Sequence, residues 1–276
     1  MMVEAAGAFA GQHILITGAT GGVGSIIASR LAREKCRISA VGRREDRLED
    51  LTEWVEDLGG SCNPINKDMH DLDATEFIVQ KATERFGPLD TAILGATKFA
   101  LGQFAEFDET AIEEIIRVNL LSPIAITRAI IPDMLRRGFG KIAFISSVAG
   151  ILPLPYMAVY DASKSAIITF TKALAQEIEG SGVTVSCISP RAIDTVIMNQ
   201  MKPLTVGLGW IIDTPEAVAE QILRATALGK THVSIGSMEK LVPFLQSVFP
   251  NLVKRILNIT RYEMDHFFET GENVGK

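Results

Sequence analysis

Short runs of apolar residues alternate along the chain with longer amphipathic stretches of helical length. Several of the short runs carry few polar positions, as strands covered on both faces by helices do. The predicted strands are His13–Thr17, Arg37–Val41, Ser61–Asn66, Leu89–Leu94, Lys141–Ser146, Val183–Ser189 and Thr231–Ile235. The predicted helices include Val23–Glu34, Arg44–Leu58, Asp71–Phe86, Pro123–Arg137 and Met157–Ile178. This alternation predicts an α/β fold with a doubly wound parallel sheet of about seven strands.

The elements follow one another without an internal repeat or a low-complexity linker. This predicts one domain over residues 13–236, after an N-terminal extension of residues 1–12. Within it, residues 192–214 form a long connection of the kind that often closes over a binding site. The tail, residues 237–276, contains two predicted short helices, Leu241–Phe249 and Leu252–Ile259. We expect the tail to pack on the domain or on another subunit, with peripheral membrane contact as the alternative.

Composition and charge narrow the class of protein. The chain has 276 residues, of which 47% are hydrophobic and 22% charged, and its net charge is −6. This usage is typical of a globular protein, and an acidic chain lacks the basic surface that nucleic-acid binding requires. The three cysteines form no CxxC pair and the four histidines are scattered, so we predict neither a disulfide framework nor a metal site. A reducing, cytoplasmic compartment is the simplest expectation.

Neither the N-terminus nor the longest uncharged segment fits a secretory or membrane signal. Met1–Gly11 contains Glu4 and has no basic region, which argues against a secretory signal. Ile142–Tyr160 carries no charge and is nearly long enough to span a bilayer. Pro153 and Pro155 would break a helix there, however, and a strand followed by a loop fits better. We therefore expect no transmembrane span.

The first predicted strand runs directly into the glycine-rich turn TGATGGVG, and the turn runs into a helix. Gly18, Gly22 and Gly24 let the backbone turn sharply and approach a pyrophosphate, which the N-terminal amides of the helix would bind. Thr20 and Val23 complete the turn. Because the turn follows the first strand of an alternating α/β chain, it predicts a nucleotide site.

The end of the second strand indicates which nicotinamide cofactor is bound. NAD-binding folds place an Asp or Glu there to hold the ribose 2′-hydroxyl. This chain has Gly42 at that position, followed by Arg43 and Arg44. Guanidinium groups bind a 2′-phosphate that a carboxylate would repel. A solvated basic helix start is the alternative, although a helix N-terminus disfavours cations. The sequence predicts NADP(H) rather than NAD(H).

Four residues in the middle of the chain carry candidate chemistry. Tyr160 and Lys164 lie one turn apart on one helix face, where an ammonium group would stabilise a phenolate and lower the tyrosine pKa. Ser147 follows the hydrophobic strand just upstream, and Asn119 lies further upstream in the triplet VNL. A tyrosine with a lowered pKa serves as an acid and a base near neutral pH.

Together, the TGxxxGxG turn and the Asn119, Ser147, Tyr160 and Lys164 series resemble the short-chain dehydrogenase/reductase family in order, spacing and surroundings. The resemblance extends from about His13 to Ile235. It implies a Rossmann-type fold and an oxidoreductase that interconverts a carbonyl and an alcohol with a nicotinamide cofactor.

The resemblance also implies roles. Tyr160 would exchange a proton with the substrate oxygen, and Ser147 would hold that oxygen. Lys164 would bind the nicotinamide ribose and lower the pKa of Tyr160, while Asn119 would anchor a water-linked proton relay. The implied cofactor-binding residues are Gly18, Thr20, Gly22, Val23, Gly24, Arg43, Arg44, Asp68, Met69, Ala96, Ile193 and Thr195.

Three positions depart from the family pattern. Leu94–Thr97 replaces the usual Asn-Asn-Ala-Gly, which puts the local geometry of the adenosine pocket in doubt. Arg191 stands where the family has glycine after proline, and we expect it to face solvent, with a substrate or cofactor anion as the alternative. Asp161 follows Tyr160 where small residues are common, and a carboxylate there favours the helix start.

The expected substrate is a hydrophobic carbonyl compound or alcohol, because Val148–Met157 and the apolar residues Met198, Met201 and Trp210 carry no charge. One alternative is a β-ketoacyl reductase acting on a carrier- or coenzyme-A-bound chain, with Arg136, Arg137 and Lys141 at the pocket rim. The other is a non-catalytic NADP(H)-binding regulator. The family resemblance further implies a homodimer or homotetramer through the helices Pro123–Arg137 and Met157–Ile178.

Overall fold

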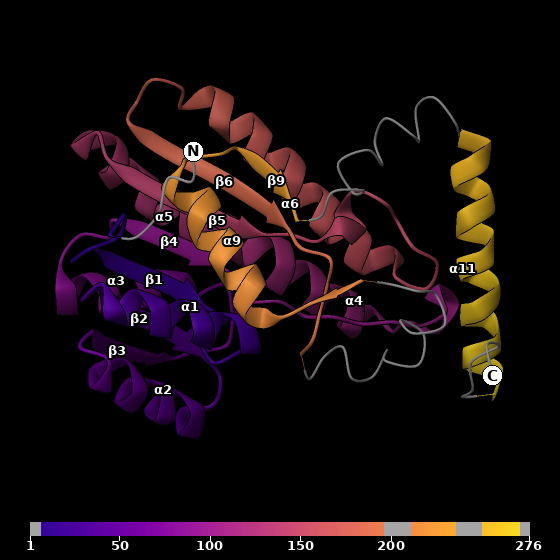
Figure 1. Ribbon diagram of the computed structural model, residues 1–276, viewed down its shortest axis with the longest axis horizontal. Helices are drawn as coiled ribbons and strands as arrows, with labels where there is room; N and C mark the ends of the chain where they lie inside the picture. Colours follow the sequence, from indigo (N-terminus) through magenta and orange to yellow (C-terminus); the bar gives the residue numbers. More distant parts are fainter. Residues whose placement is uncertain (1–6, 196–210, 236–249, 271–276) are drawn as a thin grey trace.

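The computed structural model describes residues 7–195, 211–235 and 250–270, and its centre is a parallel sheet of seven strands in the order β3-β2-β1-β4-β5-β6-β9 (Figure 1). The strands are β1 (His13–Thr17), β2 (Arg37–Gly42), β3 (Ser61–Asn66), β4 (Thr91–Leu94), β5 (Gly140–Ile145), β6 (Val183–Ser189) and β9 (His232–Ser234). The helices are α1 (Gly22–Arg33), α2 (Glu45–Asp57), α3 (Ala74–Phe86), α4 (Glu109–Ile116), α5 (Ser122–Arg137), α6 (Ala158–Glu177), α9 (Pro215–Ala227) and α11 (Pro250–Thr270). The predicted doubly wound α/β fold is confirmed.

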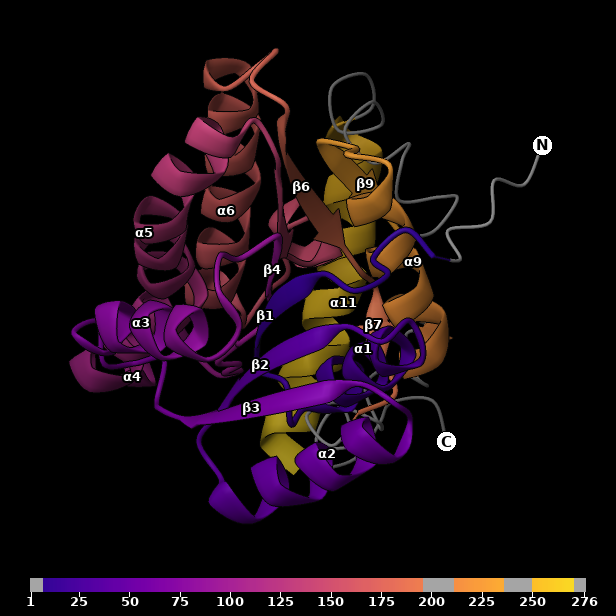
Figure 2. The same ribbon diagram turned by 90° about the vertical axis from the view of Figure 1, so that its left-hand side faces the viewer.

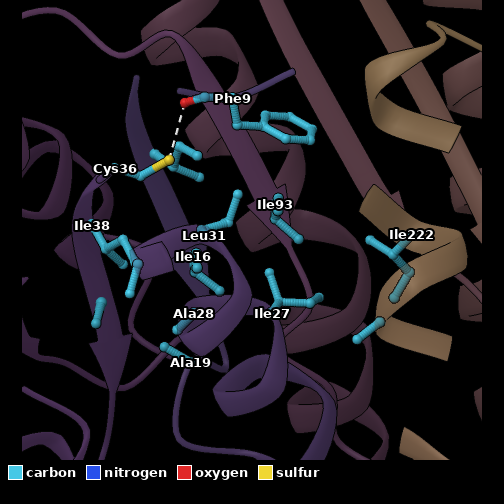
Figure 3. Packing of buried hydrophobic residues seen from close by; sticks show 14 of the residues in the cluster. Phe9, Ile16, Ala19, Ile27, Ala28, Leu31, Cys36, Ile38, Ile93 and Ile222 are labelled. Carbon is cyan, nitrogen blue, oxygen red and sulfur yellow. Dashed lines mark hydrogen bonds between the residues drawn. The ribbon is translucent and has the colours of Figure 1, made fainter. Parts of the chain in front are cut away.

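Helices cover both faces of the sheet, so the protein has two hydrophobic layers. Figure 2 shows α3, α5 and α6 on one face and α1 and α9 on the other. Under α1 and α9, buried side chains such as Ile16, Ile27 and Ile222 pack together (Figure 3). The second layer buries residues such as Phe144 and Ile167. Strands covered on both faces must be apolar on both, which explains the short uninterrupted hydrophobic runs in the sequence.

The strand order reverses direction at β1 and β4, which lie side by side in the middle of the sheet. Chain connections leave the sheet in opposite directions at such a switch point, and a crevice opens at the carboxyl ends of the strands. The glycine-rich turn follows β1 and residues 95–98 follow β4. The fold therefore brings these two segments to the same crevice.

Most element bounds agree with the sequence analysis to within one to three residues, and three differences are larger. Helix α4 lay outside the predicted elements. The expected long connection begins and ends with two short parallel strands, β7 (Ala192–Ile193) and β8 (Ile212–Asp213). The predicted short helix Leu252–Ile259 is part of the much longer α11. Pro250 can begin that helix because its missing N–H is not needed there. The prediction for Leu241–Phe249 lies outside the described residues.

Among the described residues, one helical stretch, Glu109–Arg137, is long and apolar enough to cross a membrane by length and composition. It joins α4 to α5 through a π-helical turn, Arg117–Leu121. Its side chains Ile126 and Met134 are buried in the core beside the sheet, and α5 packs against α3. Ile142–Tyr160, by contrast, forms a strand, a short 3-10 turn (Val148–Gly150) and the start of α6, as expected.

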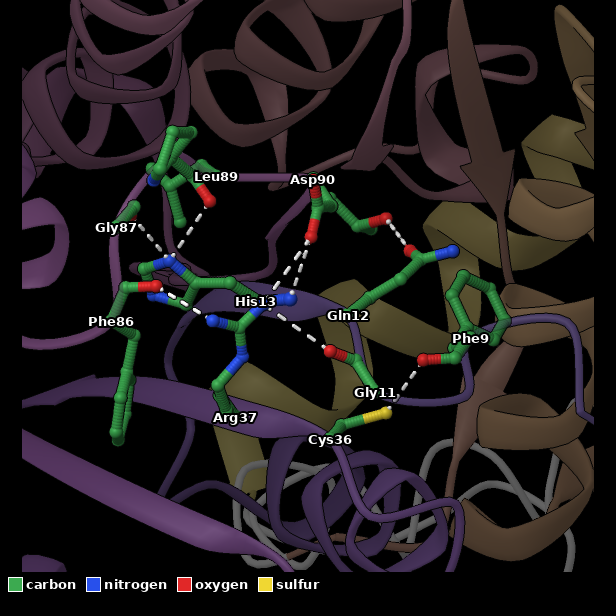
Figure 4. Close-up of polar contacts among 12 residues, drawn as sticks. Phe9, Gly11, Gln12, His13, Cys36, Arg37, Phe86, Gly87, Leu89 and Asp90 are labelled. Atoms are coloured by element: carbon green, nitrogen blue, oxygen red, sulfur yellow. Dashed lines mark hydrogen bonds and ion pairs between the residues drawn. The ribbon is translucent and has the colours of Figure 1, made fainter.

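A polar network closes the opposite, amino end of the sheet (Figure 4). The backbone N–H of His13 donates to Asp90 at 2.9 Å, and Arg137 forms an ion pair with the same carboxylate. The His13 ring donates from Nδ1 to the carbonyl of Gly87 and accepts at Nε2 from the hydroxyl of Ser39, each at 2.9 Å. Burial lowers the pKa of His13, which keeps the ring neutral in this arrangement. The network fixes the C-terminal end of α5 at this edge.

Candidate active site

The glycine-rich turn has the shape that a dinucleotide cradle requires. Gly18 has φ +70°, and a Cβ there would lie 3.0 Å from the backbone of Ala96. A Cβ at Gly24 would lie 2.2 Å from the carbonyl oxygen of Gly18. Helix α1 begins at Gly22, and a Cβ at that position would meet the methyl group of Thr195 at 3.3 Å. At Gly18 and Gly24 only glycine allows these approaches, and the N-terminal amides of α1 are positioned for an anion. The residues present fit a pyrophosphate.

The hydroxyl of Thr17 joins the ends of β1 and β4. Its Oγ1 accepts hydrogen bonds from the backbone N–H groups of Gly95 and Ala96 at 3.1 and 3.2 Å. Leu94–Thr97 stands where the family usually has Asn-Asn-Ala-Gly. The backbone of Gly95 and Ala96 is nevertheless held in direct contact with the glycine-rich turn. Ile193 and Thr195 also reach this crevice, from β7 and the residues after it.

The two arginines after β2 each face a carboxylate. Arg43 lies 3.7 Å from Asp68, and Arg44 makes two hydrogen bonds to Asp46 at 2.6 and 3.2 Å. All four side chains are exposed. The sequence argued against a solvated basic helix start because a helix N-terminus disfavours cations. That argument does not hold for Arg44, because Asp46 in the first turn of α2 neutralises it. Met69, another residue that the family resemblance implies for cofactor binding, follows β3 one residue after Asp68. Its side chain is buried, and its carbonyl accepts a hydrogen bond from the Ser122 hydroxyl.

The structure brings the four candidate catalytic residues to the carboxyl end of the central strands. Ser147 follows β5, Tyr160 and Lys164 lie on α6, and Asn119 lies in the π-helical turn before α5. Such turns are found frequently at functional sites. The hydroxyls of Ser147 and Thr97 lie close enough to Tyr160 to lower the pKa of its phenol. The sequence analysis assigned no role to Thr97, whose only signal was its place three residues after the end of β4, at the sheet's switch point.

Burial dominates the protonation of the phenol. The pKa of Tyr160 is raised to about 12, mainly by burial; Ser147 and Thr97 act to lower it, and the charge of Asp161 acts to raise it. The expected lowering by Lys164 is not seen, because Nζ of Lys164 donates to the carbonyl of Ile145 at 3.1 Å and lies 5.6 Å from the Tyr160 ring centre. Burial also lowers the pKa of Lys164, to about 8. At neutral pH the phenol is therefore protonated.

Asn119 holds the segment after β4 against α6. Its Oδ1 accepts from the backbone N–H of Lys98 at 2.7 Å, and its Nδ2 donates to the carbonyl of Lys98 at 2.9 Å and to Ser163 Oγ at 3.1 Å. Ser163 in turn donates to the carbonyl of Tyr160 at 2.6 Å. Through this chain of hydrogen bonds, Asn119 positions both Thr97 and the catalytic turn of α6.

The space beside Tyr160 is apolar. Phe99 packs edge-on against the Tyr160 ring with centres 5.0 Å apart. The cluster around them consists of Phe99, Leu101, Ala149, Leu154, Tyr156, Met157, Tyr160, Met264 and Phe267. Met264 and Phe267 come from α11, and no motif in the sequence indicated their presence. Met198, Met201 and Trp210, which the sequence analysis placed at the substrate, lie outside the described residues.

Two of the departures from the family pattern have structural partners. Arg191 does not face solvent as expected, since it makes two hydrogen bonds to Asp213 at 2.6 and 3.1 Å and both side chains are largely buried. Asp161 is buried too: its Oδ2 accepts from the backbone N–H of Leu154 at 2.6 Å, and its Oδ1 has no hydrogen-bond partner among the described residues. Burial raises the pKa of Asp161 to about 7. Among the described residues, no group of His, Cys, Asp and Glu side chains forms a metal site.

Comparisons with known proteins identify the class. A family model described as short chain dehydrogenase matches residues 12–204, and the chain belongs to that family. The ketoacyl reductase HetN of Nostoc sp. is 32% identical over 256 residues, which cover 89% of this chain and 88% of that protein. The 3-ketodihydrosphingosine reductase of Mus musculus is 32% identical over 241 residues, covering 83% of this chain and 73% of that protein.

The fold is also that of solved members of the family. The crystal structure of L-sorbose reductase from Gluconobacter frateurii, complexed with NADPH and L-sorbose, has a TM-score of 0.76 at 22% identity, and covers 84% of this chain and 98% of its own. Family membership and the relatives named as reductases define the chain as an oxidoreductase that interconverts C=O and CH–OH groups.

The buried carboxyl of Asp161 generates a stability prediction. Its pKa rises from 3.8 toward about 7 on folding, so the carboxyl is neutral in the folded protein and its contribution to stability is lost as pH rises through this range. Asp161→Asn keeps an acceptor for Leu154 and cannot ionise. We expect the variant to be more stable than the wild type by about 1–4 kcal/mol at pH 8 and nearly equal to it at pH 4.

Chemical denaturation at the two pH values measures this difference, with the exposed Asp57→Asn as the matched control. The control should show no pH-dependent gain. An Asp161→Asn variant whose stability differs from the wild type equally at pH 4 and pH 8 would show that folding does not raise the pKa of this carboxyl.

Proposed function

We propose that the chain is an NADP(H)-dependent reductase that converts a ketone on a hydrophobic small molecule to a secondary alcohol, with Tyr160 as the proton donor. The observation that carries the proposal is the position of the Tyr160 phenol, which lies beside Ser147 and among apolar side chains at the sheet's switch point. Oxidation of NADPH on addition of an aliphatic ketone such as 2-octanone, followed by its absorbance, tests the reaction. No turnover of any ketone in a graded series would contradict it.

In this proposal the bound cofactor supplies the hydride, which adds to the carbonyl carbon. Ser147 holds the carbonyl oxygen by a hydrogen bond, and the Tyr160 hydroxyl gives that oxygen its proton as the negative charge develops there. A phenol whose pKa is raised to about 12 is fully protonated at neutral pH, which is the state that reduction requires. Lys164, one turn along α6, would bind the ribose of the nicotinamide.

The choice of NADP(H) rests on Arg43 and Arg44. Both side chains are exposed, and the ion pairs that they form with Asp68 and Asp46 lie in high dielectric, where such pairs contribute little. A 2′-phosphate with up to two negative charges can therefore replace Asp68 and Asp46 as the partner of the guanidinium groups. Gly42 adds to this preference, because it carries no carboxylate, and because Thr20 Oγ1 lies only 3.1 Å from where a Cβ would stand.

The second candidate function is reduction of a carrier- or coenzyme-A-bound β-ketoacyl chain, which the name of the Nostoc relative favours. Its expected basic rim is not supported. Arg136 pairs with Asp133 and Arg137 pairs with Asp90. Lys141 is the second residue of β5. All belong to the amino edge of the sheet, opposite Tyr160. A non-catalytic regulator is not favoured, because the chain belongs to a family whose matched relatives are named as reductases.

We also propose a cytoplasmic homodimer or homotetramer. The three cysteines are buried free thiols, as a reducing compartment allows. Leu121 and Leu135 are large apolar side chains exposed on the helical stretch that contains α4 and α5. Residues 13–236 would form the catalytic domain, with residues 192–214 as the substrate loop.

Self-association is tested by light scattering at micromolar concentration. The subunit mass is 29.9 kDa, and we expect a species of two or four subunits. Replacing Leu121 and Leu135 with Asp together should shift the protein to monomer, because charges are costly in an apolar interface. A wild-type protein that stays monomeric would contradict the assembly.

Cofactor choice is tested by titrating NADPH and NADH at fixed salt against Arg43→Ala, Arg44→Ala and the double variant. Each loss of a charge-assisted contact should weaken NADPH binding about tenfold, while NADH binding should barely change. Arg47→Ala, an exposed arginine one turn further along α2, is the matched control and should change neither. Equal losses for both cofactors would mean that the arginines support the adenine side rather than the phosphate.

A further inference from the structure

An ion pair between an arginine and an aspartate lies where the chain leaves the carboxyl end of β6. Arg191 donates two hydrogen bonds to the carboxylate of Asp213, from Nε at 3.1 Å and from Nη2 at 2.6 Å. The exposed fractions are 17% for the Arg191 side chain and 15% for that of Asp213. Such a two-pronged contact fixes direction as well as distance, and removing one partner leaves a poorly solvated charge. The pair therefore holds two backbone segments in one arrangement.

The two segments are the short parallel strands β7 and β8. Each strand has two residues, with Ile193 paired with Asp213, and strands this short are not stable by themselves. The backbone N–H of Asp194 donates to the carbonyl of Asp213 at 3.0 Å. Asp213 thus binds the residue before β7 through its side chain and the residue after β7 through its backbone.

The stretch of chain that the pair fixes extends between two parts of the site. At one end, the carbonyl of Pro190 accepts a hydrogen bond at 2.8 Å from the backbone N–H of Val148, the residue after Ser147. At the other end, the methyl group of Thr195 lies 3.3 Å from where a Cβ of Gly22 would stand, at the first residue of α1. This stretch therefore connects the surroundings of Ser147 with the N-terminus of α1.

The course of a bound dinucleotide follows from these two contacts. A pyrophosphate at the N-terminus of α1, and a hydride delivered to a carbonyl beside Ser147, place the nicotinamide half between them, along residues 190–195. The adenine half extends in the opposite direction, toward Arg43 and Arg44 at the end of β2, because β2 and β5 lie on opposite sides of β1. The ion pair therefore lies on the side of the nicotinamide.

We infer that the ion pair between Arg191 and Asp213 is a positioning pair for the nicotinamide half of the cofactor. It acts through residues 192–195, which it holds in place between Ser147 and α1. The adenine half, on the other side of the pyrophosphate, does not depend on it. The inference rests on the proposed function for the location of the nicotinamide beside Ser147, and it adds the residues that prepare this half of the site.

The test compares a whole cofactor with one of its halves, by titrating NADPH and adenosine 2′,5′-bisphosphate, which lacks the nicotinamide half. Arg191→Met and Asp213→Asn remove the ion pair while preserving side-chain size. We expect each variant to bind NADPH about tenfold more weakly, with a change of less than about twofold for the bisphosphate. Because the two residues act as one unit, the double variant should lose no more NADPH affinity than either single variant.

The matched control is Arg137→Met, which breaks a comparable ion pair with Asp90 at the amino edge of the sheet. The side chains of that pair are 26% and 20% exposed. The control should lower the stability of the protein and leave the affinities for NADPH and the bisphosphate unchanged. The double variant at Arg191 and Asp213 leaves no unpaired charge, so it decides the test if a single variant does not fold.

The outcomes separate this inference from the proposed function. Equal weakening of NADPH and the bisphosphate would overturn it, because the pair would then support the site as a whole, and so would unchanged NADPH binding in both single variants. If the wild type prefers NADH, the same comparison is made with NADH and AMP. A wild type that reduces no ketone contradicts the proposed function, and the binding ratios still decide the role of the ion pair.

Discussion

The close contact between the ends of β1 and β4 organises the rest of the site. Gly18 approaches the backbone of Ala96 so closely that a side chain could not be accommodated, and Thr17 binds the two N–H groups beside it. One residue further, Thr97 lies close enough to Tyr160 to lower the pKa of its phenol. The glycine-rich turn and Tyr160 are therefore held together by a few consecutive residues, as the proposed delivery of hydride and proton to a single carbonyl would require.

Burial of charged and polar groups then determines the chemistry available at that point. Tyr160, Lys164 and Asp161 lie within five residues on α6, and burial shifts the pKa of each toward its neutral form. A region that disfavours charge before reaction strengthens every hydrogen bond to a charge that develops during it. The same apolar surroundings that keep the phenol protonated would also suit the hydrophobic substrate that we propose.

Much of this could be predicted from the sequence, because it depends on local patterns. The buried strands are short apolar runs, and Gly18 and Gly24 occupy positions where neighbouring backbone leaves no room for a Cβ. Contacts between distant segments could not be predicted. The pairing of Arg44 with Asp46 depends on how α2 begins, and that of Arg191 with Asp213 on two short strands hidden in a long connection. Met264 and Phe267 lie a hundred residues from Tyr160 and carry no motif, so only the packing of α11 reveals them.

The central claim is that the Tyr160 phenol transfers the proton, and single-turnover oxidation of enzyme-bound NADPH by 2-octanone tests it most directly. In Tyr160→Phe the ring still packs against Phe99, so cofactor affinity, measured by NADPH fluorescence, should be nearly that of the wild type. Hydride transfer should slow by roughly 100- to 10,000-fold, the usual contribution of a general acid. Transfer within a few-fold of the wild-type rate would contradict the account, because the proton would then come from another group.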